Sequence, residues 1–172
     1  KVPVRYQADV AVIGGGIAGV CAAEAIRSMD PHVHITMIGD ETFPPYSRPM
    51  ISYVLDGSQP HAKLPIRSNH FYDNLKINAL LGRRATGIDV NSRQVMLADD
   101  TRVDFDRLLI ASGADARKLK ADGLALDNIF YMRTETDVRR QLKALDGARQ
   151  GLVLGGGLVG FKAAYGLLRR GL

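Results

Sequence analysis

Two glycine-rich segments with the same pattern most constrain the fold of this chain. Residues 12–19 read Val-Ile-Gly-Gly-Gly-Ile-Ala-Gly, and residues 153–160 read Val-Leu-Gly-Gly-Gly-Leu-Val-Gly. Each segment follows a short apolar run, opens a helical pattern and continues into a pair of alanines. One Gly-x-Gly-x-x-Gly is a weak signal, but two copies in matching contexts predict two sites for nucleotide diphosphates. The alternative is that both turns merely end ordinary strands.

The three glycines of such a turn have separate physical roles. The first permits the tight turn from strand to helix, the second lets the backbone approach a pyrophosphate, and the third lets the helix pack close to the strand. The N-terminus of the following helix offers free N–H groups and a partial positive charge to the phosphate.

Composition narrows the function classes. The chain has 172 residues, a formal net charge of +5 and an apolar share of 46%. The basic residues are scattered and aromatics are few, so we favour a surface suited to anionic phosphates over a nucleic-acid binder. No apolar stretch is long enough to predict a membrane span. The single cysteine excludes an intrachain disulfide and fits a reducing, cytoplasmic setting. His61 and His70 lack metal-ligand spacing, so no metal is expected.

The first part of the chain reads as a right-handed βαβ unit. A buried strand over 8–13 precedes a helix over 17–29, which Asp30 and Pro31 end, and a second strand covers 33–38. Cys21 is expected on the apolar face of the helix. Asp40 and Glu41 follow the second strand, where an acidic group hydrogen-bonds the adenosine ribose in a dinucleotide fold. The alternative for both is an acidic surface turn.

The hydrophobic pattern changes its period in the middle of the chain. A stiff, proline-rich loop over 42–50 carries Arg48, which is suited to contact a phosphate or adenine unless the loop is only a rigid connection. Helical turns are expected near 50–55 and 69–74. Alternating patterns then predict a series of short strands. These strands cover 76–80, 84–90, 94–97 and 102–105. A buried strand over 107–110 and another strand over 128–131 follow.

The last part of the chain contains two more helices. Thr134 is expected to cap a helix that runs to about residue 145, and a strand over 151–154 leads into a helix over 158–170. Because a Rossmann unit needs a second strand, we expect the chain to be a piece of a longer protein. The predicted fold class is α/β: a Rossmann-like, three-layer domain with a small antiparallel insertion, plus the start of a second Rossmann-like domain. The predicted domains are 1–146, with the β-meander at about 76–106, and 147–172.

The order of the motifs resembles a known family. These motifs are GGGIAG, IGDE, PPYSRPMIS, LLIASGA, MRTETD and GGGLVGFKAA. They are similar to the N-terminal part of the pyridine nucleotide-disulfide oxidoreductases, flavoproteins with two dinucleotide-binding domains. The resemblance is strongest to the rubredoxin and ferredoxin reductases and to the flavin module of nitrite reductase. It implies that the first turn binds FAD and that the second begins a site for NADH or NADPH.

The resemblance also implies roles for matching positions. It implies that the first glycine turn binds the FAD pyrophosphate, that Asp40 or Glu41 holds the ribose and that the backbone of Ala85 meets adenine. Further residues would lie along the cofactor. These FAD positions are Gly14, Gly16, Ile17, Ala18, Gly19, Asp40, Glu41, Arg48, Pro49, Ala85, Ala111, Ser112, Gly113 and Arg133. The nicotinamide positions are Gly155, Gly157, Leu158, Val159 and Gly160.

Two positions depart from the family pattern. Where the reductases usually carry a Lys and a Glu that pair beside the flavin ring, this chain has Tyr53 and Lys162. One interpretation is that Lys162 still supplies a cation near the flavin and favours its anionic reduced form. The other is that Lys162 points to solvent and the pair is lost. We name both residues as candidate catalytic residues.

The resemblance implies an NAD(P)H-dependent FAD oxidoreductase without thiol chemistry. The segment where related disulfide reductases and NADH oxidases carry redox cysteines has none here. Electrons are therefore expected to pass from NAD(P)H through flavin to an external redox protein or domain. The alternative is a non-catalytic nucleotide-binding module. The isolated chain is expected to hold FAD weakly and to be inactive, and self-association through exposed apolar surface is left open.

Overall fold

The computed structural model describes residues 3–172, which form two compact units. The first unit contains the described residues up to Tyr46 and Arg67–Gly113, and the second contains Ser47–Ile66 and Ala114–Leu172. This division follows the packing of the chain. The predicted boundary after residue 146 concerns which ligand each part binds, and it stays a prediction.

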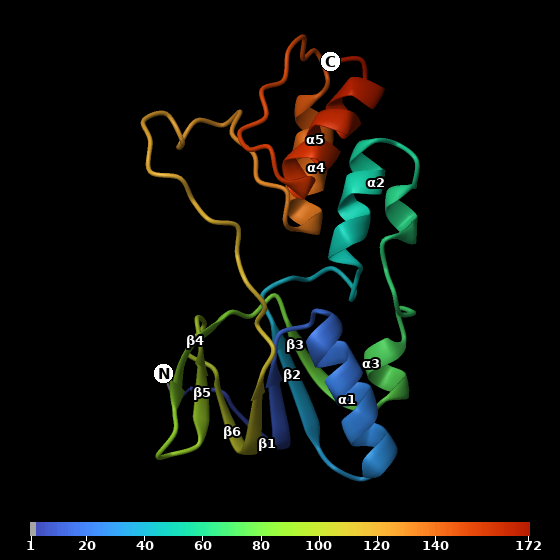
Figure 1. The fold of residues 1–172 in the computed structure, drawn as a ribbon. Coiled ribbons are helices and arrows are strands. Elements are labelled where there is room, and N and C mark those ends of the chain that lie inside the picture. The colour runs from blue at the N-terminus through green and yellow to red at the C-terminus, as the bar shows by residue number, and fades with distance from the viewer. Residues whose placement is uncertain (1–2) are drawn as a thin grey trace. The chain divides into compact units, whose positions relative to one another are not determined.

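The first unit is built on one six-stranded mixed sheet with the order β3-β2-β1-β6-β5-β4 (Figure 1). Its strands are β1 (Arg5–Ile13), β2 (Ile35–Gly39), β3 (Ile77–Leu81), β4 (Ala85–Asp89), β5 (Gln94–Leu97) and β6 (Arg102–Ile110). The central strand β1 runs parallel to both β2 and β6. Its apolar run is buried because both faces of a central parallel strand are covered.

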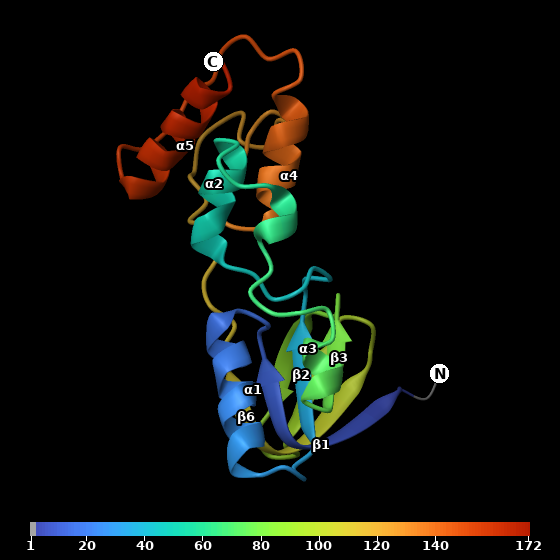
Figure 2. The same cartoon turned by 90° about the vertical axis from the view of Figure 1, so that its right-hand side faces the viewer.

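Two helices cover one face of this sheet (Figures 1 and 2). α1 (Ile17–Met29) and the short α3 (Phe71–Asn74) meet the strands in one apolar cluster. α1 has the predicted bounds. It buries Val20 and Ala23, whereas Cys21 is exposed. The prediction that Cys21 packs on the buried face is therefore wrong, because that face is formed by Gly19, Val20 and Ala23.

A second apolar cluster covers the opposite face. It joins side chains of the parallel strands, such as Ala11, Ile38 and Leu80, to Val95 and Val103 of the antiparallel part. The antiparallel strands therefore close over this face. This arrangement confirms the predicted α/β class with its antiparallel insertion.

Two strand predictions need correction in this unit. β3 does not belong to the antiparallel series, because it pairs in parallel with β2 from Ile35↔Ile77 onward. The separate strands predicted over 102–105 and 107–110 are one continuous strand, β6. β6 stays extended through Asp106 because β1 supports it along its whole length, with β5 on the other side of its first half.

The second unit is helical (Figure 2). Its helices are α2 (Ile51–Leu55), which follows the 3₁₀ turn η1 (Arg48–Met50), η2 (His61–Lys63), α4 (Glu135–Ala144) and α5 (Leu158–Arg169). α4 begins with the predicted cap, in which the Thr134 hydroxyl accepts from the Asp137 backbone and the Asp137 carboxylate accepts from the Thr134 backbone. The helices predicted after Thr134 and over 158–170 are confirmed.

The strands predicted over 128–131 and 151–154 do not form. A strand needs a neighbour to satisfy its backbone groups, and the described residues of the second unit contain no strand. Leu152 and Leu154 are accordingly exposed, at 86% and 66%. Across residues 3–172, none of the helices has the length and apolar character that crossing a membrane requires.

Candidate functional site

The first glycine turn connects β1 to α1 at the carboxyl edge of the sheet. Gly14 has a φ of +115°, a backbone conformation that L side chains rarely adopt. A Cβ on Gly14 would also overlap the carbonyl oxygen of Ala111, and one on Gly19 would overlap the carbonyl oxygen of Gly14. These contacts explain the first and third glycines as requirements of the fold.

The second glycine turn repeats this geometry in the second unit. Gly155 has a φ of +116°, and a Cβ on Gly160 would overlap the carbonyl oxygen of Gly155. The residues that precede the two helices also match, with φ and ψ of −76° and −176° at Gly16 and −80° and 176° at Gly157. The second turn therefore has the local shape of the first, although no strand leads into it.

The middle glycines mark the open part of each turn. A Cβ built on Gly16 or Gly157 would meet nothing within 4 Å. No side chain caps the N-terminus of α1 or of α5. The fold does not need glycine at these two positions, and the backbone N–H groups of both first turns are open to an anion. These residues fit the diphosphate of a dinucleotide.

The turn after β6 lies directly beside the first glycine turn. The Ala111 backbone N–H donates to the Ile13 carbonyl at 2.7 Å, which extends the pairing of β6 with β1 to the edge of the site. The backbone of Ala111 and Ser112 lies against Gly14, within 3.0 Å of a Cβ built there. Gly113 follows with a φ of +69° and is exposed. The structure thus brings Ala111 and Ser112 to the first turn.

The two predicted carboxylates differ in their surroundings. The Glu41 carboxylate accepts a hydrogen bond from the Tyr46 hydroxyl at 3.2 Å, whereas Asp40 is exposed at the end of β2. The Arg83 backbone N–H donates to the Gly39 carbonyl at 2.8 Å, so the start of β4 at Ala85 follows this same strand end. The first unit thus brings Asp40, Glu41 and Ala85 toward the edge that carries the first turn.

The remaining predicted FAD residues belong to the second unit. The Arg48 guanidinium donates to the Arg133 carbonyl at 3.3 Å, and the Arg133 guanidinium donates to the Ala114 carbonyl at 2.8 Å. Pro49 lies in the same 3₁₀ turn as Arg48 and is exposed. Two arginines distant in sequence are therefore held side by side.

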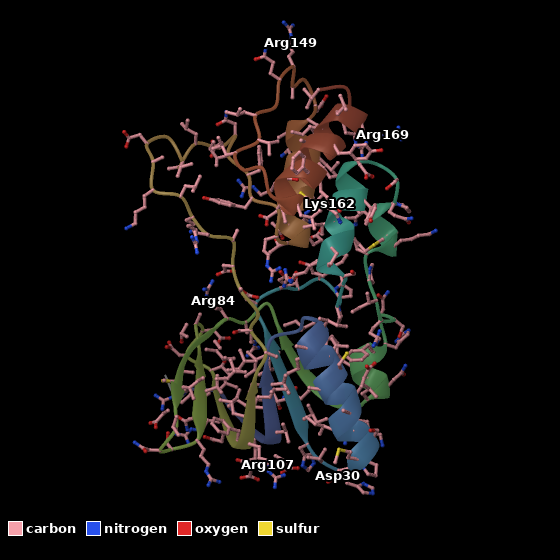
Figure 3. All side chains as sticks on the ribbon, viewed as in Figure 1. Asp30, Arg84, Arg107, Arg149, Lys162 and Arg169 are labelled. Atoms are coloured by element: carbon pink, nitrogen blue, oxygen red, sulfur yellow. The ribbon has the colours of Figure 1, made fainter. Side chains whose placement is uncertain are left out.

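Tyr53 and Lys162, the positions that depart from the family pattern, are also in contact. The Lys162 ammonium lies over the Tyr53 ring, 5.1 Å from its centroid. Lys162 is labelled in Figure 3, where it lies between α5 and α2. Lys162 therefore does not simply extend into solvent, because the ring of Tyr53 holds it by a cation–π interaction. Its role beside the flavin stays a prediction.

The sequence analysis missed a stripe of residues along α5 that makes further contacts with α2. Gly166 is the buried residue of α5, and a Cβ there would lie 2.9 Å from the Leu55 side chain. Arg170 donates to the carbonyls of Leu55 at 2.8 Å and Val54 at 3.1 Å, at the end of α2. Lys162, Gly166 and Arg170 are spaced by four residues, and this period is the signal that could have identified them.

An ion pair fixes the outer face of α1. Arg67 donates to both carboxylate oxygens of Glu24, at 2.6 and 2.9 Å. The hydrogen bonds from Arg67 lower the pKa of Glu24 below its ordinary value. This pair joins the helix of the first glycine turn to the start of the segment that leads into α3.

Comparison with known proteins agrees with this geometry. A family model described as pyridine nucleotide-disulphide oxidoreductase matches residues 8–172. The chain belongs to this family. Its members use FAD and NAD(P)H, the two cofactors that the sequence resemblance implied.

The relatives include reductase components of oxygenases. The ferredoxin reductase component of chlorobenzene dioxygenase from Cupriavidus sp. (strain PS12) is 35% identical over 164 residues, which are 95% of this chain and 40% of that protein. The rubredoxin-NAD(+) reductase of Pseudomonas putida is 31% identical over 165 residues, 94% of this chain and 43% of that protein. The chain thus spans well under half the length of these relatives.

Solved structures have the same fold. The NADH:rubredoxin oxidoreductase of Clostridium acetobutylicum matches with a TM-score of 0.84 and 26% identity, over 96% of this chain and 43% of that one. The covalent putidaredoxin reductase–putidaredoxin complex also matches with a TM-score of 0.84, at 30% identity, over 94% of this chain and 40% of that one. The fold assignment therefore stands on structure as well as on motifs.

Proposed function

We propose that this chain is part of an FAD-dependent oxidoreductase that passes electrons from NAD(P)H to a small redox protein or domain. The observation that carries the proposal is the duplicated turn, with open space at Gly16 and Gly157 and an uncapped helix after each. When bound, FAD supplies the chemistry by accepting hydride from NAD(P)H and releasing electrons to the acceptor. The chain's own task is to bind and orient the two dinucleotides and to exclude water.

At the first turn, the backbone N–H groups of Ile17, Ala18 and Gly19 would bind the FAD diphosphate. Asp40 or Glu41 would hold the ribose hydroxyls, and the backbone of Ala85 would meet adenine. Asp40 is the better placed of the two carboxylates, because Glu41 is already hydrogen-bonded to Tyr46. Ala111, Ser112 and Gly113 would form the wall of the site, and their small side chains leave room for the ligand.

The family resemblance supports a role along the FAD for Arg48, Pro49 and Arg133. Two hydrogen bonds support a shared role, because the bond to the Arg133 carbonyl orders the Arg48 side chain and the bond to the Ala114 carbonyl orders the Arg133 side chain before a ligand arrives. At the second turn, the helix start at Leu158, Val159 and Gly160 would bind the diphosphate of NAD(P)H.

Lys162 and Tyr53 are the proposed catalytic residues. A cation held beside the flavin ring would stabilise the negative charge that the ring gains on reduction, by several kcal/mol at most. Lys162→Glu in the full-length protein should therefore lower the flavin reduction potential. An unchanged potential would argue against this role and leave Lys162 as a structural contact of α2 and α5.

The external electron acceptor is inferred from the relatives and not from a residue of this chain. The matched relatives are named as reductases of ferredoxin and rubredoxin, and the putidaredoxin reductase structure contains its protein partner. The proposed partner of this protein is therefore a small redox protein or domain in the cytoplasm. Nothing in the motif order or the two turns favours nucleic acid.

The test measures, in the full-length protein, which cofactor each glycine turn binds. The preparation should show a bound-flavin spectrum that NADH or NADPH bleaches without oxygen. Gly16→Ala should weaken FAD binding by more than about tenfold, about 1.4 kcal/mol. Gly157→Ala should retain FAD and weaken NAD(P)H binding by a similar factor.

Two outcomes would overturn the proposal. A colourless protein that takes up no added FAD would exclude the flavin assignment. A protein that binds FAD but that neither nicotinamide nucleotide bleaches would favour the alternative, a nucleotide-binding module without turnover.

A further inference from the structure

Tyr72 on α3 is a residue that neither the motifs nor the family pattern singled out. Its ring packs edge-on against Phe71, with centroids 5.1 Å apart, and contacts the apolar cluster formed by β1, β2 and α1. These contacts fix the direction in which the ring points. The hydroxyl at its far end is therefore held in place by the core.

That hydroxyl reaches the first glycine turn. A Cβ built on Gly15 would lie 3.6 Å from the Tyr72 hydroxyl oxygen and 4.0 Å from the Met37 sulfur, with nothing else within that range. The middle of the turn, between Gly14 and Gly16, is therefore flanked by one polar atom and one apolar atom. The polar atom comes from a helix more than fifty residues away along the chain.

The Tyr72 hydroxyl has no hydrogen-bond partner among residues 3–172. The side chain is half-buried, and burial raises its pKa above the ordinary value of 10.0. The phenol is therefore a neutral donor at physiological pH. The hydroxyl is not among the buried side-chain atoms that lack a partner, so it is accessible and free to donate to a ligand.

The second turn gives an internal comparison. A Cβ on Gly156, the counterpart of Gly15, would meet nothing within 4 Å. The two turns share their backbone geometry, but the hydroxyl is present at the first one alone. It is therefore not a requirement of the glycine turn, and it distinguishes the first site from the second.

We propose that Tyr72 donates a hydrogen bond to the ADP part of the dinucleotide bound at the first glycine turn. This inference rests on the proposed function, because it takes that turn to be a dinucleotide site. The acceptor is a phosphate or ribose oxygen, since those groups lie against the turn itself. Tyr72 is thus a binding residue that adds specificity for the first ligand.

The test uses the full-length apoprotein and two probes, FAD and ADP. Tyr72→Phe removes the hydroxyl and keeps the ring, so the core packing is preserved. All variants carry Gly157→Ala as well, so that ADP reports on the first turn. Calorimetric titration should give dissociation constants for FAD and ADP that both rise about tenfold in Tyr72→Phe, as expected for a lost hydrogen bond to a charged group.

Tyr6→Phe is the matched control. Tyr6 is also half-buried and packs against an apolar cluster, and its hydroxyl is likewise without a hydrogen bond among the described residues, but it lies at the opposite end of β1 from the turn. Its removal should leave both dissociation constants unchanged. The thermal stability of the two apoproteins should match that of the parent, which separates binding from folding.

The outcomes distinguish this inference from the proposed function. If the parent binds FAD and Tyr72→Phe binds both probes with parental affinity, the inference is wrong and the flavin site stands. If FAD binding weakens and ADP binding does not, the hydroxyl does not contact the ADP part, and the inference is equally wrong. If the parent binds neither probe, the proposed function fails and the inference fails with it.

Discussion

Single glycine positions within each turn have different reasons for being glycine. Gly14 and Gly19 are required by backbone contacts inside the turn, whereas Gly16 faces open space. The repeated pattern therefore combines two kinds of constraint, one from folding and one from binding. Substitution by alanine separates them, because a methyl group tests the space around each position.

We expect Gly19→Ala to lower the free energy of unfolding by about 1–3 kcal/mol, because the new Cβ would overlap the Gly14 carbonyl oxygen. Gly16→Ala should change it by less than about 0.5 kcal/mol, because its extended backbone accepts alanine and its surroundings are empty. Urea denaturation of the apoproteins measures both. Equal losses of stability in the two variants would contradict this division of roles.

The Glu24–Arg67 pair predicts a pH dependence. Because the folded state lowers the pKa of Glu24, the pair stabilises the fold above the ordinary value of 4.5, and this stabilisation is lost as the pH falls through the lower folded value. Both side chains are about one-third exposed, so the contribution is at most about 1 kcal/mol.

Glu24→Gln should therefore destabilise the protein at neutral pH and have little effect well below pH 4.5, as measured by denaturant titration at both pH values. Asp73→Asn is the control, because Asp73 is 84% exposed and its one ion-pair contact is 4.0 Å long. A Glu24→Gln penalty that persists unchanged in acid would mean that the glutamate acts through packing instead of charge.

At the scale of elements, α2 and α5 are joined by three contacts of different kinds. Lys162 stacks on Tyr53, Gly166 accommodates Leu55, and Arg170 binds the carbonyls at the end of α2. Helix α2 has only five residues and would not be stable alone. Its contacts with α4 and α5 therefore keep it helical.

A double-mutant cycle tests the contact between Tyr53 and Lys162. Tyr53→Lys alone should bring two ammonium groups together, and Lys162→Glu alone should bring a carboxylate to the ring face, so each should destabilise the second unit. The double variant places opposite charges together. Its loss of unfolding free energy should be smaller than the sum of the two single losses by about 0.5–1 kcal/mol. Strictly additive effects in thermal denaturation would show that the two residues do not interact.

At the scale of the whole molecule, the chain contains two glycine turns, which we propose as dinucleotide sites, and one cysteine. That cysteine, Cys21, is exposed on α1, two residues after the last glycine of the first turn, and this sequence holds no second cysteine with which it could form a dithiol. The proposed electron path therefore runs between cofactors without a thiol in this part of the protein.

Cys21→Ser in the full-length protein should leave the rate of flavin bleaching by NADH unchanged, because the side chain takes no part in the proposed transfer. Stopped-flow absorbance under anaerobic conditions measures this rate, and alkylation of the parent with iodoacetamide provides a chemical counterpart. A loss of bleaching in the serine variant would place a thiol on the path and contradict the proposed mechanism.

Local order in the chain was enough to predict the βαβ unit, both glycine turns, the capped helix after Thr134 and the family. These features depend on neighbouring residues: apolar period, caps, and glycines where a Cβ would collide with the backbone. The stretches 128–131 and 151–154 have the same strand-like composition but remain irregular, because a strand forms only with a partner that satisfies its backbone groups.

Tertiary structure alone decided the remaining contacts. It placed Tyr72 beside Gly15, Lys162 over Tyr53 and β3 in the parallel part of the sheet. Each of these joins segments that lie far apart in the chain, and no local period or motif records which distant surfaces will pack together. Sequence thus determined the two glycine turns and the family, and the packing of distant segments decided which side chains surround each turn.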